Sequence, residues 1–134
     1  MSGTASNAPR DIAPHKRLAA ALAALHKALL NVQATGHPSS GNPFALWQAV
    51  MHHEDFAWLR PMSGLMARID EAGAKGATPS AEEMGRFLAE ADALVRREGL
   101  FRDKLEEFRD DPLVAFNAAE LEGTLSALWN RAAH

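Results

Sequence analysis

Residues 44–61, FALWQAVMHHEDFAWLRP, decide how this chain folds. Two apolar runs flank four consecutive polar residues, HHED at positions 52–55, and a proline follows at position 61. Proline inside a helix removes a backbone donor and clashes with the preceding turn. We therefore predict that one helix ends in the polar tetrapeptide and that a kink or a new helix start lies near Arg60.

The apolar residues of this stretch recur at helical spacing. Phe44, Trp47 and Met51 are three and four positions apart, which places them on one side of a short helix over residues 44–53. A second helical pattern follows at Phe56, Leu59, Met62, Met66 and Ile69. Large apolar side chains at this spacing are typical of a core face, and they also occur at partner-binding surfaces.

Toward the N-terminus, a longer helix is expected. Spacings of four and three residues predict a seam at which helices pack nearly parallel, formed by Leu18, Leu22, Leu25, Leu29 and Val32. Turn-forming residues at 36–43 end it. The small polar residues 1–13 predict a flexible tail, so residues 14–134 are expected to form one helical-bundle domain.

Toward the C-terminus, two more helices are indicated. Ser80 and Glu83 form a capping-box signature after a linker at 72–79, and Asp110-Asp111-Pro112 predicts another helix start. The seams are Met84, Phe87, Ala91, Leu94, Glu98, Phe101, Leu105 and Phe108, then Val114, Ala118, Leu121, Leu125, Leu128 and Ala132. Gly99 could end a helix, but the seam continues in phase across it, which favours one long bent helix.

These elements predict an all-α fold. It is an up-and-down four-helix-type bundle with one additional short helix and a kink near Pro61. Alanine and leucine dominate the apolar residues, while tyrosine is absent, and this balance favours helix over strand.

Composition excludes several function classes. The chain has no cysteine, so a thiolate metal site and a cysteine nucleophile are excluded. A formal charge of −3 argues against nucleic-acid binding through phosphate contacts. No apolar run approaches the ~20 residues of a membrane span. The apolar run at 18–25 is too short and alanine-rich for a secretory signal, so we expect a soluble, cytoplasmic protein.

A metal-binding protein or a metal-dependent enzyme is one alternative. The candidate ligands are His26, His52, His53, Asp55, Glu98 and Glu120, because histidines and inward carboxylates build metal sites in helical bundles. The helical spacings Glu-x-x-His, His-x-x-x-His and His-Glu-x-x-His do not occur. Polar tetrapeptides between apolar segments more often end one helix and cap the next, and we therefore expect no cofactor.

Binding is the function that the sequence favours over catalysis. No nucleophile elbow, phosphate loop or dinucleotide motif is present. The candidate surface for a protein partner or a small ligand is Trp47, Met51, Trp58 and Met62. A homodimer is also expected, because second apolar rows at Leu29-Leu30, Phe87-Leu88 and Leu128-Trp129 need to be covered.

Overall fold

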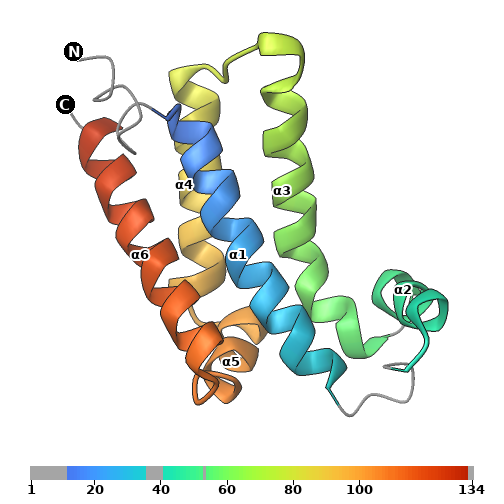
Figure 1. Ribbon diagram of the computed structural model, residues 1–134. Helices are drawn as coiled ribbons and strands as arrows, with labels where there is room; N and C mark the ends of the chain where they lie inside the picture. The colour runs from blue at the N-terminus through green and yellow to red at the C-terminus, as the bar shows by residue number, and fades with distance from the viewer. Residues whose placement is uncertain (1–11, 36–40, 53, 133–134) are drawn as a thin grey trace, which may run out of the picture.

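The computed structural model describes residues 12–35, 41–52 and 54–132, all of whose regular elements are helical (Figure 1). The α-helices are α1 (Pro14–Ala34), α2 (Pro43–His52), α3 (Arg60–Ala72), α4 (Ala81–Arg96), α5 (Leu100–Glu107) and α6 (Pro112–Ala132). Two 3₁₀ segments, η3 (Glu54–Leu59) and η4 (Ala74–Gly76), lie on either side of α3. The all-α prediction is confirmed.

Four helices, α1, α3, α4 and α6, form an up-and-down bundle (Figure 1). Helix α1 packs against α3 and α6, and α4 packs against the same two helices. Consecutive bundle helices run in opposite directions (Figure 1), and α1 and α6, which both carry rows of buried leucines, share the most extensive contact between two elements. The part of the chain that the structure describes contains no helix long and apolar enough to cross a membrane.

Local capping sets the helix starts that the sequence indicated. The Ser80 hydroxyl accepts a hydrogen bond from the Glu83 amide at 3.1 Å, and the Glu83 carboxylate accepts one from the Ser80 amide at 3.0 Å. Asp111 Oδ1 accepts hydrogen bonds from the amides of Leu113 and Val114. Each cap satisfies backbone donors that the first turn of a helix leaves without partners.

The helix start near Arg60 is confirmed. The chain runs as a 3₁₀ helix to Leu59, and α3 begins at Arg60 with Pro61 in its first turn. Proline is tolerated there because the first amides of a helix have no intrahelical acceptor. The position of Pro61 in the sequence therefore predicted this helix start correctly.

Continuity across Gly99 is the expectation that the structure overturns. Helix α4 ends at Arg96, Arg97 is extended, and α5 begins at Leu100. The apolar phase survives because α5 turns back under the bundle and buries Phe101 and Leu105 in the same core. Glu98, which the long-helix interpretation placed on a seam, is consequently an exposed residue of the connection.

Most of the predicted second apolar rows are covered within the chain itself. Phe87 and Leu88 are both buried, Leu29 is fully buried and Leu30 is partly buried against the core. Of these rows, only Trp129 is half exposed. The homodimer was predicted because these apolar rows need to be covered. Since the chain itself covers most of them, a homodimer would have to form through another surface.

The 3₁₀ segment η3 precedes α3 at its lower end in the view of Figure 1 and contacts α1, α2 and α5. Trp58 is 5% exposed, and its indole N–H donates to Gln33 Oε1 of α1 at 3.0 Å. Its ring lies 5.3 Å from the ring of Phe101 and 6.0 Å from that of Phe108, measured between centroids. One side chain thus joins η3 to α1, to α5 and to the residue after α5.

The opposite end is closed by a close approach between α1 and the end of α3. His15 is buried, and a Cβ placed on Gly73 would lie 2.7 Å from its Nε2 atom. A larger residue at position 73 would require the imidazole to shift from this place. Together with η3, this contact fixes α1 against α3 at both ends.

Replacing Trp58 by Ala is expected to destabilise the fold by ~3–5 kcal/mol, because it removes a buried ring and leaves a cavity. Trp47 is the matched control: its side chain is 56% exposed, and Trp47→Ala is expected to change the free energy of unfolding by less than ~0.5 kcal/mol. Urea unfolding followed by circular dichroism measures both. Equal stabilities of the two variants would contradict the packing described for Trp58.

Candidate functional site

Helix α2 projects from the lower end of the bundle (Figure 1) and packs chiefly on η3. Its start is fixed locally, because Asn42 Oδ1 accepts hydrogen bonds from the amides of Phe44 and Ala45 at 3.0 and 3.1 Å. Pro43 occupies the first helical position, where it suits the helix. A short, well-capped helix is thereby held beside the four-helix core.

The outward side of α2 is apolar. Phe44, Trp47 and Met51 are 67%, 56% and 51% exposed. The rings of Phe44 and Trp47 are stacked, with centroids 6.2 Å apart and planes inclined by 28°. We call these three residues the α2 apolar face. A group of large apolar side chains on one projecting helix is typical of a binding surface rather than of scattered surface residues.

A cavity of about 470 Å³ adjoins this face. Its lining comes from α1, α2, η3 and α3 and consists of His26, Met51, Phe56, Leu59, Arg60, Ser63 and Gly64. The lining is mainly apolar, and Phe56 and Leu59 at its floor are also buried core residues. Met51 belongs both to the α2 apolar face and to the cavity wall, so the two features form one continuous surface.

His26 is a polar group on the cavity wall. Its imidazole is half-buried between the apolar rows of α1, and desolvation lowers the pKa of His26 below its ordinary value of 6.5. At neutral pH the ring is therefore uncharged and can both donate and accept a hydrogen bond. The cavity thus joins an apolar floor to a neutral polar group.

The structure divides the predicted binding residues into two pairs. Trp47 and Met51 lie on the α2 apolar face, whereas Trp58 and Met62 are buried in the core and are not available to a partner. Both pairs follow helical spacing, and spacing alone does not distinguish a core face from an exposed one. Trp58 of η3 and Met62 of α3 face the core, whereas Trp47 and Met51 lie on the exposed side of α2.

The predicted metal ligands are dispersed. His26 lines the cavity, His52 ends α2, Asp55 lies in the first turn of η3, and Glu98 and Glu120 are exposed on the α4–α5 connection and on α6. His53 lies outside the described residues. Across residues 12–35, 41–52 and 54–132, no group of three or more histidines, aspartates or glutamates is arranged to hold a metal ion.

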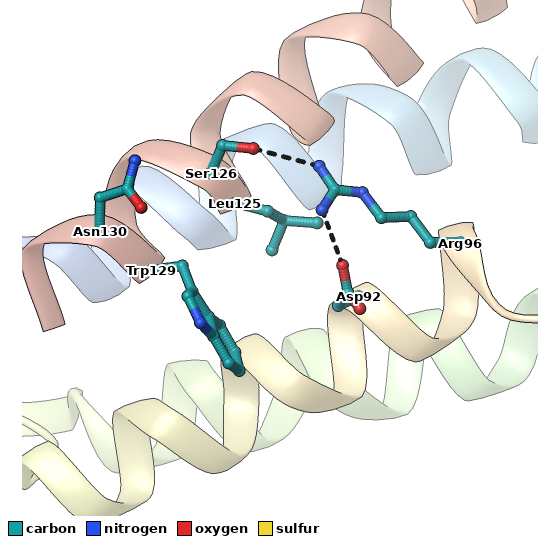
Figure 2. A pocket seen from close by; sticks show the side chains of 6 residues that line it. All are labelled: Asp92, Arg96, Leu125, Ser126, Trp129 and Asn130. Carbon is teal, nitrogen blue, oxygen red and sulfur yellow. Dashed lines mark hydrogen bonds and ion pairs between the residues drawn. The ribbon is translucent and has the colours of Figure 1, made fainter. Parts of the chain in front are cut away.

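A second pocket, which the sequence did not indicate, lies between α4 and α6 (Figure 2). Its volume is about 360 Å³, and it is lined by Asp92, Arg96, Leu125, Ser126, Trp129 and Asn130. The only sequence signal for it is the opposite charge of Asp92 and Arg96 at a four-residue spacing. That spacing is common on exposed helix faces and does not by itself predict a pocket.

Comparison with known proteins gives no guide to this site, since no family model, no curated protein and no solved structure matches the chain. Function is therefore inferred from the geometry of the α2 apolar face, its cavity and the α4–α6 pocket.

The lowered pKa of His26 predicts a specific pH dependence of stability. The unfolded chain binds a proton at this residue near pH 6.5, whereas the folded chain does so only at lower pH. Between the folded pKa of His26 and pH 6.5, the unfolded state therefore binds more protons than the folded state. The contribution of His26 to the free energy of unfolding is consequently lost as the pH falls through this range. Below the folded pKa that contribution no longer changes.

Nuclear magnetic resonance titration of the His26 ring protons is expected to give a pKa below 6.5. In addition, the wild type should lose more stability than His26→Gln between about pH 7.5 and pH 5, since glutamine does not titrate. A measured pKa at or above 6.5, or identical pH profiles for the two proteins, would contradict the burial of this imidazole.

Proposed function

We propose that this protein acts by binding a partner protein through the α2 apolar face, rather than by catalysis. The observation that carries this proposal is Met51, which connects three exposed apolar side chains to a largely apolar cavity. The partner that this surface fits is an amphipathic helix. Its apolar side would lie along Phe44 and Trp47, and one of its side chains would enter the cavity beside His26.

The size of the surface favours a helix over a flat protein surface. An aromatic side chain buries about 150–250 Å² when it is covered, so the exposed parts of Phe44, Trp47 and Met51 offer roughly 350 Å². A stable interface between two globular proteins buries about 800 Å² on each partner. A helix that inserts one side chain into the cavity gains further contact area there, whereas a flat partner surface does not enter the cavity.

The rigidity of the surface also favours recognition. The stacked rings of Phe44 and Trp47 are already in contact, and the Asn42 cap fixes the helix that carries them. A pre-ordered aromatic pair loses little conformational entropy on binding, and aromatic anchors contribute strongly to interface affinity. We also propose a cytoplasmic location, for which only the sequence gives support.

Self-association is a second candidate, carried by a different surface. Three large apolar side chains are each more than 60% exposed, namely Leu100 at the start of α5 and Leu113 and Phe116 near the start of α6. Leu113 and Phe116 are three residues apart on α6 and therefore share one side of it. A two-fold contact through this surface would cover side chains that the chain itself leaves in water.

Photo-crosslinking in the native cell tests partner binding. The photoreactive residue benzoylphenylalanine replaces Trp47, and the same replacement of exposed Gln48 on the neighbouring side of α2 is the control. We expect crosslinks from position 47 to one recurrent protein, at a segment with helical apolar spacing, and roughly tenfold fewer from position 48.

A synthetic peptide of that segment should bind to the wild type, and it should bind to Trp47→Ala at least about tenfold more weakly. Crosslinks that are equal at both positions, or that join two copies of this chain, would refute the proposed partner.

Sedimentation equilibrium tests self-association. A homodimer is expected to show a mass about twice 14.5 kDa at high concentration. Phe116→Asp should weaken it, because a charge in an apolar contact is costly, while Phe44→Asp should not. A constant mass near 14.5 kDa would exclude the dimer, and loss of the dimer in Phe44→Asp alone would assign it to the α2 apolar face instead.

A further inference from the structure

The α2 apolar face is too small to hold a partner helix by itself. Its exposed side chains offer roughly 350 Å², less than half of the ~800 Å² that each partner buries in a stable interface. A partner bound there therefore needs further surface of this chain. The lining of the cavity indicates where that surface lies, because His26 of α1 and Ser63 and Gly64 of α3 form part of its wall.

Gly64 leaves an opening in the interior of α3. It is exposed, and a Cβ atom placed on it would meet no neighbouring group within 4 Å. Glycine destabilises the interior of a helix relative to alanine, and no close contact within the described residues requires it here. A position without a side chain does allow another backbone to approach closely. Gly64 therefore suits a second helix that lies against α3 beside the cavity.

Small residues continue from the cavity along one side of α1 and α3, which pack on each other and run in opposite directions (Figure 1). On α3, exposed Ala67 follows Gly64 by three residues. On α1, Ala19 and exposed Ala23 precede His26 at spacings of four and three. Residues at these spacings share one side of a helix. We call the surface formed by Ala19, Ala23, Gly64 and Ala67 the α1–α3 flank.

A smaller hollow of about 90 Å³ lies at the other end of this flank, lined in part by His15, Lys16, Ala19 and Asp70. His15 and His26 are eleven residues apart on α1, which is three helical turns, so both lie on the same side of α1 roughly 16 Å from each other. His15 is only 6% exposed, and among the described residues its imidazole has no hydrogen-bond partner. A polar group that entered the hollow would supply the missing bond.

We propose, on the basis of the partner helix inferred for the α2 apolar face, that this helix continues along the α1–α3 flank to the hollow at His15. Its contacting side carries a large apolar residue for the cavity and small residues where it crosses Gly64 and Ala67. About eleven residues from the first, it carries a short hydrogen-bonding residue, such as serine or asparagine, that enters the hollow. The flank thereby supplies the contact area that the α2 apolar face lacks.

Charged side chains on the flank test this path. The reporter is benzoylphenylalanine at position 47, and Ala23→Arg or Ala67→Arg is added to it, because neither alanine lines the cavity. Ala24→Arg is the matched control, since Ala24 is also exposed but is turned about 100° from Ala23 around α1. We expect crosslinking from position 47 to the same protein to fall roughly tenfold in Ala23→Arg and Ala67→Arg and to stay unchanged in Ala24→Arg. Arginine is nearly as good a helix former as alanine, and circular dichroism should show that all three variants fold.

Nuclear magnetic resonance locates the far end of the bound helix. At saturation with a synthetic peptide of the crosslinked segment, the ring signals of His15 should shift together with those of His26. A peptide that lacks the residues assigned to the hollow should leave the His15 signals in place and bind at least about fivefold more weakly.

The outcomes separate the path from the proposed function. Crosslinking from position 47 that persists in both Ala23→Arg and Ala67→Arg, an equal loss in Ala24→Arg, or a bound full-length peptide that leaves the His15 signals unchanged would overturn the path while partner binding at α2 stands. Absence of any crosslinked protein at position 47 in the otherwise unchanged chain, or crosslinks only to a second copy of it, would overturn both.

Discussion

The insertion of Trp58 into the lower end of the bundle is the constraint on which the remaining structure depends. The indole contacts Phe101 and Phe108 and donates a hydrogen bond to Gln33, so one ring ties η3 to α1 and α5. The 3₁₀ segment occupies the space at the end of the four-helix core, and α5 folds back over it. Trp58 and its neighbours fill that space, while α2 packs on the bundle through Ala49 and Leu46 and keeps its aromatic side in water.

This division explains why the molecule carries its two candidate binding surfaces at separate places. The α2 apolar face and its cavity arise where η3 meets α1 and α3, and Met51 belongs to both. The α4–α6 pocket arises where Trp129 and the Asp92–Arg96 pair stand on opposite sides of Leu125. One surface is mainly apolar, whereas the other is polar and carries the paired charges of Asp92 and Arg96.

The lowered pKa of His26 adds a property to the first surface. Burial keeps the imidazole neutral where a charged ring would oppose an apolar partner. A bound partner would remove more water from the ring, and this would lower its pKa further.

The sequence by itself determined the helical class, the leucine seams of α1 and α6, the capped starts at Ser80 and Asp111, and the helix start beside Pro61. Each of these follows from spacing or from local backbone chemistry, which neighbouring residues settle among themselves. Only the tertiary structure decided that Trp58 is buried while Trp47 is exposed, and that the chain breaks at Gly99 although its apolar phase continues. It also brought Asp92 and Arg96 of α4 beside Trp129 of α6. These outcomes depend on which helical faces pack against other parts of the chain. Helical spacing shows only that a face is apolar and does not show what covers it.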